Sequence, residues 1–131
     1  MSSAVSPVKV FLVEDSPLIR NRLYESLDSP GRIEVVGHAD NEREATAALN
    51  RGQWDAVVLD LRLREGTGFG VLRALGAARP AGRKVIVYTN YAVPHLRDEC
   101  TQLGADHVLD KGADYDQLRE LLDAMADGRR D

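Results

Sequence analysis

The sequence contains a single cysteine, Cys100, so no disulfide bond can form within the chain. Cysteine and histidine residues also lack the spacing of a zinc site. We therefore expect a reducing compartment. The first seven residues lack the basic region and the long apolar run of a signal peptide. No apolar stretch is long enough to span a bilayer. These absences favour a cytoplasmic protein with no membrane partner.

An excess of positive charge is also missing. The chain carries 17 Lys and Arg residues against 21 Asp and Glu residues, a formal net charge of -4. Binding of duplex DNA draws on counterion release at a basic face, so we expect no direct nucleic-acid partner. The tail after the last helix pattern, residues 127–131, is too short for a helix-turn-helix. We predict a single domain over residues 1–131, with a core at about 8–127 and an N-terminal tail at 1–7.

Short apolar runs alternate with helix-like patterns along the whole chain. This alternation is typical of βαβ units and predicts a parallel sheet covered by helices. The wholly apolar run 56–59 indicates a central strand that is buried on both faces. The mixed polarity of 33–39 indicates a strand at the edge of the sheet. The five predicted strands cover residues 8–13, 33–39, 56–59, 84–88 and 107–109.

Capping residues indicate where several helices begin. Ser16 precedes a proline, Asn41 has a glutamate three residues on, and Asp114 has a glutamine three residues on. These pairs predict helix N-termini at all three places. Cys100 falls on the apolar face of the predicted helix after the fourth strand, so we expect a buried, unreactive side chain.

Polar side chains follow four of the predicted strands, at the point where each strand ends. Glu14 and Asp15 follow the first, Asp60 the third, Thr89 the fourth and Lys111 the fifth. The carboxyl ends of parallel strands share one edge of the sheet, and ligands bind there. Crowded carboxylates resist ionisation unless a cation neutralises them, and an all-oxygen group suits Mg²⁺ or Mn²⁺. Each acid could instead be an ordinary helix cap, but their joint placement favours a site.

Four motifs extend this interpretation. They are Val-Glu-Asp-Ser at 13–16, Val-Leu-Asp-Leu-Arg-Leu at 58–63 followed by Gly-Thr-Gly at 66–68, Val-Tyr-Thr at 87–89, and Gly-Ala-Asp at 104–106 leading to Lys111. In these motifs the chain resembles the receiver domains of bacterial two-component response regulators, from Val8 to about Met125. The resemblance implies a flavodoxin-like, doubly wound α/β fold with five helices and a five-stranded parallel sheet of order 2-1-3-4-5.

The resemblance also implies a chemistry for the acidic residues. Asp60 is then the phosphoacceptor, and a histidine kinase or a phosphotransfer protein supplies the phosphoryl group. Asp15 and Asp60 bind Mg²⁺ directly, the backbone carbonyl of Arg62 is a third protein ligand, and Glu14 acts mainly through water. A carboxylate is a feasible nucleophile for such a transfer.

The same resemblance implies how the signal leaves the domain. Lys111 neutralises charge on the phosphoryl oxygens, and the Thr89 hydroxyl swings toward them. This movement changes the face formed by the fourth helix, the fifth strand and the fifth helix. An unidentified downstream protein, or a second copy in a homodimer, then binds that face. The expected function is a phosphorylation-dependent signalling switch, with no enzymatic activity beyond its own phosphorylation and dephosphorylation at Asp60.

Several positions depart from the family pattern. Val108 replaces the usual aromatic residue three positions before the lysine, and Gly112 replaces the proline that commonly follows it. A relay through Tyr91 or another residue would then replace the usual coupling. Positions two beyond the phosphoacceptor and two beyond the threonine tend to set the phosphoryl lifetime in this family. Here they are Arg62 and Tyr91, and we hypothesise that both shield the acyl phosphate.

Two other functions remain as alternatives. One is a receiver-like module that binds proteins without being phosphorylated. The other is an aspartate-based phosphohydrolase, which would carry a second aspartate two residues after its nucleophile. Here Asp15 is followed by Ser16 and Pro17, and the chain is too short for a cap domain.

Overall fold

A five-stranded parallel sheet forms the centre of the molecule. The computed structural model describes residues 6–76, 79–90 and 92–129. The strand order is β2-β1-β3-β4-β5, which confirms the predicted flavodoxin-like topology. The strands are β1 (Val8–Val13), β2 (Ile33–Ala39), β3 (Ala56–Leu59), β4 (Lys84–Thr89) and β5 (His107–Asp110). The helices are α1 (Pro17–Leu27), α2 (Glu42–Arg51), α3 (Gly68–Leu75), α4 (Pro94–Gln102) and α5 (Tyr115–Asp127).

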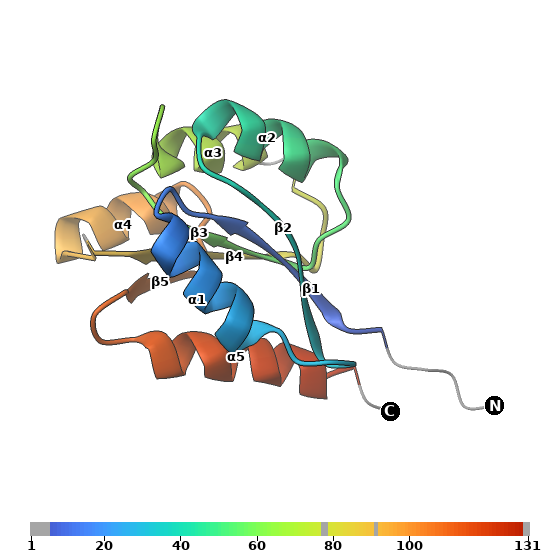
Figure 1. Cartoon of the computed structure of the whole chain (residues 1–131). Coiled ribbons are helices and arrows are strands. Elements are labelled where there is room, and N and C mark those ends of the chain that lie inside the picture. The colour runs from blue at the N-terminus through green and yellow to red at the C-terminus, as the bar shows by residue number, and fades with distance from the viewer. Residues whose placement is uncertain (1–5, 77–78, 91, 130–131) are drawn as a thin grey trace.

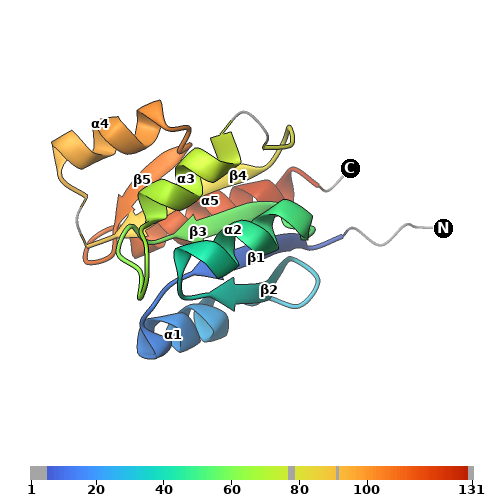
Figure 2. The same cartoon turned by 90° about the horizontal axis from the view of Figure 1, so that it is seen from above.

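Helices cover both faces of this sheet and give it two apolar cores. Helices α1 and α5 pack on one face, and α2, α3 and α4 pack on the other (Figures 1 and 2). All four residues of β3 are buried because the strand is paired on both sides and covered from above and below. The predicted edge position of β2 is confirmed. This arrangement brings the carboxyl ends of β1 and β3 side by side.

Two of the three predicted helix caps are present. The Ser16 hydroxyl accepts a hydrogen bond from the Ile19 backbone N–H at 3.3 Å. The Asn41 side-chain oxygen accepts one from the Glu44 backbone N–H at 2.9 Å. Each bond satisfies an N–H group that the first turn of a helix leaves without a backbone partner. The two caps fix where α1 begins after β1 and where α2 begins after β2.

The helix N-terminus predicted at Asp114 is confirmed, because α5 begins at Tyr115, but the expected side-chain cap is absent. Asp114 does precede α5, but its carboxylate makes no bond to that helix. The carboxylate instead accepts a hydrogen bond from the Asp110 backbone N–H at 2.9 Å. This bond closes the turn between β5 and α5, so it stabilises the loop that carries Lys111.

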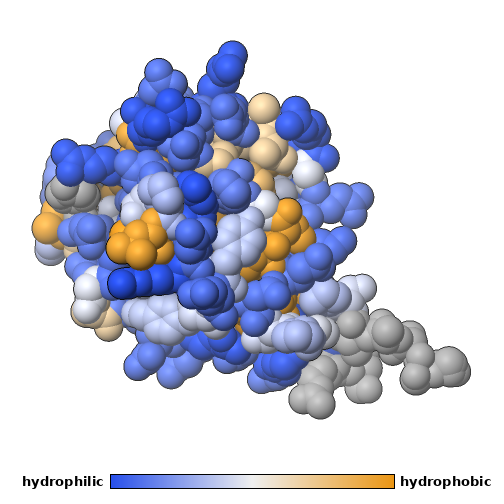
Figure 3. All heavy atoms as spheres, viewed as in Figure 1, coloured by the Kyte–Doolittle hydropathy of each residue, from blue (hydrophilic) through white to orange (hydrophobic). Residues whose placement is uncertain are grey.

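The surface is mostly hydrophilic on the face that α1 occupies, interrupted by small separate apolar patches, one of them near the start of α1 (Figure 3). Large apolar side chains exposed among the described residues are Leu18, Val36 and Val93. The expected burial of Cys100 is confirmed, and this burial raises the pKa of its thiol to about 11. Among the helices of the described residues, none combines the length and the apolar character needed to cross a bilayer.

Candidate functional site

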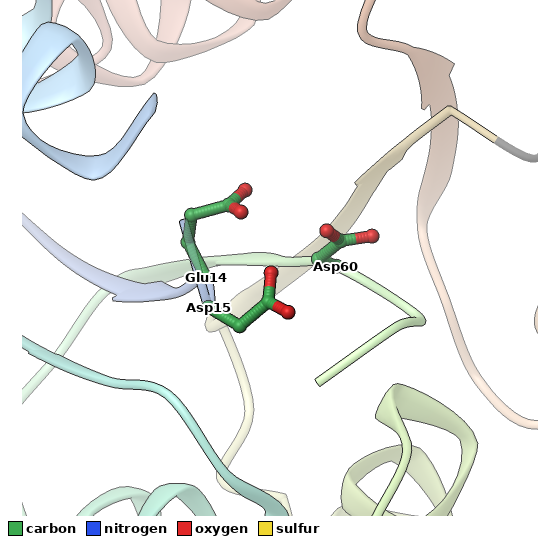
Figure 4. Close-up of side chains that lie close together, drawn as sticks. All are labelled: Glu14, Asp15 and Asp60. Carbon is green, nitrogen blue, oxygen red and sulfur yellow. The ribbon is translucent and has the colours of Figure 1, made fainter. Parts of the chain in front are cut away.

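Three carboxylates converge at the carboxyl edge of the sheet, as predicted. Glu14 and Asp15 directly follow β1, and Asp60 directly follows β3. Strands β1 and β3 are paired neighbours with Val13 opposite Leu59, so the residues after them lie next to each other. One oxygen from each carboxylate lies within 4.8 Å of the other two (Figure 4). The sheet register therefore produces this acidic cluster from residues 45 positions apart.

The three acids differ in exposure. Glu14 is 3% exposed and Asp60 is 5% exposed, whereas Asp15 is only partly buried. Burial raises the pKa of Glu14, although hydrogen bonds from Lys111 and from the Ser16 backbone N–H oppose this effect. A buried carboxylate is costly unless it is paired. The cluster is thus open to solvent on the side of Asp15 and needs positive charge.

Lys111 supplies positive charge from the end of β5. Its Nζ lies 2.6 Å from Glu14 Oε1 and 2.7 Å from Asp60 Oδ2, and its side chain is 8% exposed. Burial alone would lower the pKa of Lys111, but the hydrogen bonds to Asp60 and Glu14 outweigh burial and raise it. Lys111 is therefore an ammonium ion that bridges two acids from different strands. The sequence located this lysine at the site but did not indicate the contact with Glu14.

The other predicted residues lie around this cluster. Thr89, the last residue of β4, is fully buried, and its carbonyl accepts a hydrogen bond from the Lys111 backbone N–H at 3.0 Å. Arg62 is exposed, and its backbone N–H points to Asp60 Oδ1 at 3.4 Å. Tyr91 lies outside the described residues.

The donor set suits a small hard cation. All three side chains offer carboxylate oxygens, and one ammonium against three acids leaves a formal excess of two negative charges. Mg²⁺ prefers oxygen ligands, typically from one or two carboxylates, and fills its remaining positions with water or phosphate. The partly exposed Asp15 beside the buried Asp60 offers such a pair with access from solvent. The residues present therefore fit Mg²⁺.

Two residues of the β3–α3 segment contribute in ways that the sequence analysis missed. Thr67 caps α3, because its hydroxyl accepts a hydrogen bond from the Gly70 backbone N–H at 3.2 Å. A Cβ on Gly68 would lie 2.2 Å from the backbone oxygen of Asp60 and 2.8 Å from Leu61 Cα. Only glycine allows α3 to start so close to the backbone of Asp60. The Gly-Thr-Gly run after the acid was the available signal for both residues.

The pH dependence of stability should reveal the burial of Glu14. Because its folded pKa is raised, its favourable contribution is complete below the unfolded pKa and is lost as the pH rises through the folded pKa. We expect the unfolding free energy of Glu14→Gln, measured with EDTA, to increase relative to that of wild type over this pH rise. Urea denaturation at several pH values from about 4 upward provides the measurement. A difference that is constant with pH, or that changes in the other direction, would contradict the expected burial effect.

The fold and the acidic cluster define a doubly wound α/β protein with carboxylates at one edge of its sheet, and comparisons with known proteins agree with this fold. The chain belongs to the response regulator receiver domain family, whose model matches residues 10–123. It is 34% identical over 109 residues to protein-glutamate methylesterase/protein-glutamine glutaminase 5 of Myxococcus xanthus strain DK1622. It is 31% identical over 122 residues to the DNA-binding transcriptional activator DevR/DosR of Mycobacterium tuberculosis.

These relatives are longer proteins. The matches cover 83% and 93% of this chain but 31% and 56% of the methylesterase and of the activator, respectively. The shared part is the receiver domain, a module of phosphorylation-dependent signalling. The methylesterase is an enzyme as a whole protein, and the match to this chain covers less than a third of it.

Solved structures share the fold. A two-component response regulator of the LuxR family from Aurantimonas sp. SI85-9A1 superimposes with a TM-score of 0.81 at 23% identity, covering 95% of this chain and 89% of that one. The receiver domain of sensor histidine kinase PA1611 from Pseudomonas aeruginosa PAO1 has a TM-score of 0.75 at 24% identity, covering 93% and 99%. In that protein a magnesium ion is coordinated in the active site cleft.

Proposed function

We propose that Asp60 accepts a phosphoryl group in a reaction that depends on Mg²⁺, and that this modification switches the domain between two states. The observation that carries the proposal is the convergence of Glu14, Asp15 and Asp60 with the Lys111 ammonium at one edge of the sheet. Membership of the receiver family supports the same function.

In the proposed reaction, a carboxylate oxygen of Asp60 attacks the phosphorus atom of the donor. A new O–P bond forms, and the bond from phosphorus to the leaving group breaks. The leaving group is an imidazole when the donor is a phosphohistidine and acetate when it is acetyl phosphate. The product on Asp60 is an acyl phosphate. Catalysis then consists mainly of positioning and of neutralising charge.

Charge neutralisation comes from two sources in this proposal. Asp15, Asp60 and the backbone carbonyl of Arg62 would hold Mg²⁺, with Glu14 acting through water, and the bound ion would offset negative charge on the phosphoryl oxygens. Lys111 already contacts Asp60 at 2.7 Å, so its ammonium can follow the new phosphoryl oxygens with a small side-chain movement.

The output of the switch is proposed to be the face of α4, β5 and α5. Arg97 connects α4 with the β4–α4 loop and with β5. Its guanidinium donates a hydrogen bond to the carbonyl of Ala92 in the loop at 2.9 Å and to that of Val108 in β5 at 2.5 Å. A shift of the β4–α4 loop toward a phosphoryl group at Asp60 would therefore reach α4 and β5 together. A partner that binds one arrangement better than the other would shift the equilibrium between them.

The proposed partners follow from this scheme. A histidine kinase or phosphotransfer protein would donate the phosphoryl group in the cytoplasm. A downstream protein, or a second copy of the chain, would bind the α4–β5–α5 face. The chain itself is proposed to turn over no substrate other than its own acyl phosphate.

Intact-mass spectrometry tests the assignment of function. After incubation with acetyl phosphate and Mg²⁺, we expect the mass to increase by that of one phosphoryl group, and EDTA should prevent the increase. The Mg²⁺ dependence follows from the need to neutralise the acidic cluster. An unchanged mass with Mg²⁺ present would favour the alternative, a receiver-like module that binds proteins without phosphorylation.

The lifetime of the acyl phosphate should depend on the side chains proposed to shield it. We propose that Arg62 and Tyr91 slow the attack of water, and the exposed position of Arg62 two residues after Asp60 supports this role for Arg62. The double variant Arg62→Ala, Tyr91→Ala should lose its phosphoryl group faster than wild type after the donor is removed. The decay of the phosphorylated mass with time provides the measurement. Equal lifetimes would contradict the shielding role.

A further inference from the structure

Glu42, the first residue of α2, forms hydrogen bonds with the loop between β3 and α3, residues 61–67. The carboxylate oxygen Oε1 of Glu42 accepts a hydrogen bond from the Thr67 backbone N–H at 2.9 Å. The Glu42 backbone N–H donates to the carbonyl of Glu65, also at 2.9 Å. Glu42 therefore binds the backbone of this loop at two points, once as an acceptor and once as a donor.

Glycines make room for the Glu42 side chain. A Cβ on Gly66 would lie 2.4 Å from Glu42 Cβ, and a Cβ on Gly70 would lie 2.2 Å from Glu42 Cδ. Gly66 also has a φ of +76°, in the left-handed region that favours glycine. The loop and the first turn of α3 thus pack directly against the carboxylate. This close fit limits where Thr67 can lie.

A neighbouring contact supports the same loop. The Arg64 backbone N–H donates to the carbonyl of Asp40 at 3.0 Å, and the Arg64 guanidinium contacts both oxygens of the Asp40 carboxylate at 3.1 Å. The Arg64 side chain is 55% exposed, so this ion pair adds little by itself. Replacing the Glu42 side chain would remove the hydrogen bond from Thr67 without removing these contacts of Arg64.

The inner end of this loop lies at the acidic cluster. Arg62 and Thr67 form an antiparallel bridge across the loop, and the Gly68 backbone N–H donates to the carbonyl of Leu61 at 2.9 Å. On the other side, the Arg62 backbone N–H points to Asp60 Oδ1 at 3.4 Å. The position of Thr67 therefore influences the position of the Arg62 backbone.

We infer that Glu42 is a positioning residue for the cation site. By holding Thr67, it sets the Arg62 backbone, whose carbonyl is the proposed third protein ligand. The inference rests on the proposed function, since it concerns the affinity of the same site for Mg²⁺. Groups that orient metal ligands without touching the metal commonly change affinity by about 10-fold or more when they are replaced.

Three variants distinguish the effect of the Glu42 hydrogen bond to Thr67 from the effect of the Glu42 charge. Glu42→Asp keeps the charge at the start of α2, where an acid is favourable, but its shorter side chain cannot reach Thr67. Glu42→Gln loses the charge but keeps an oxygen that can accept the Thr67 hydrogen bond. Glu44→Ala removes the same charge from an exposed side chain in the same turn and is the matched control.

Isothermal titration calorimetry with Mg²⁺ on the full chain, without a phosphoryl donor, provides the measurement. We expect Glu42→Asp to bind Mg²⁺ about 10-fold more weakly than wild type. Glu42→Gln and Glu44→Ala should stay close to the wild-type value. Circular dichroism and urea denaturation of each variant show that it is folded.

The possible outcomes are distinct. Wild-type affinity in Glu42→Asp would overturn the inference. Equal weakening in Glu42→Gln and Glu44→Ala would also overturn it, because charge alone would then explain the loss. If wild type itself bound no Mg²⁺, the proposed function would fail, and the positioning role would fail with it.

Discussion

Asp60→Asn is expected to take up no phosphoryl group from acetyl phosphate and Mg²⁺, a complete loss relative to wild type. An amide oxygen is a far weaker nucleophile than a carboxylate oxygen, so no acyl phosphate forms. The substitution keeps the shape of the side chain and an oxygen that can accept the hydrogen bond from Lys111, which lies 2.7 Å from Asp60 Oδ2. Intact-mass spectrometry of the variant beside wild type measures the difference.

A matched control for this variant is Asp116→Asn, which removes one carboxylate from an exposed position in the first turn of α5. It should be labelled like wild type. Labelling of Asp60→Asn at the wild-type level would place the phosphoacceptor elsewhere in the chain. A peptide map of phosphorylated wild type would then locate the modified residue.

Lys111→Met should destabilise the metal-free protein by about 3 kcal/mol or more at neutral pH, because it leaves buried acids without their partner. Glu14 and Asp60 contact the same ammonium at 2.6 and 2.7 Å, and all three side chains are less than a tenth exposed. Without Lys111, the pKa of Glu14, which burial already raises, should rise further, because the lysine opposes the effect of burial. Stability would then be highest in acid and would fall as the pH rises through the folded pKa of Glu14.

Mg²⁺ should restore much of the stability that Lys111→Met loses, because a bound cation neutralises the same acids and binds only the folded state. Urea denaturation with EDTA and with excess Mg²⁺ measures both effects. Lys84→Met, at an exposed position at the start of β4, is the matched control and should be close to wild type in both conditions. Equal stability of Lys111→Met and wild type with EDTA would show that the lysine does not offset the charge of the cluster.

Much of the fold could be predicted because strand and helix patterns are local. The apolar run of β3 and the mixed polarity of β2 indicated their central and edge positions, and both are confirmed. The meeting of Asp15 and Asp60 was also predictable, since carboxyl ends of parallel strands share an edge. The strand order itself came from the family resemblance, because local patterns do not specify which strands are neighbours.

The sequence analysis failed where several backbone groups could contact the same residue. Asp114 was predicted to cap α5, but its carboxylate is used by the Asp110 backbone N–H instead. Both bonds are short-range, and the sequence does not show which donor is closer in the folded loop. The role of Gly68 was missed for a similar reason, since its contact with the Asp60 backbone exists only once α3 packs against the end of β3.

The amino-acid sequence alone determined the alternation of strands and helices. It also determined that acids and a lysine stand at strand ends, and which chemistry such groups favour. Tertiary packing decided which of these groups meet. It pairs Lys111 with both Glu14 and Asp60, and it places the Glu42 carboxylate where the loop after β3 donates a hydrogen bond to it. Hydrophobic periodicity is written along the chain and needs no partner to be recognised. A hydrogen bond or an ion pair depends on distances of a few ångströms between distant segments, and these exist only after the sheet and its helices have assembled.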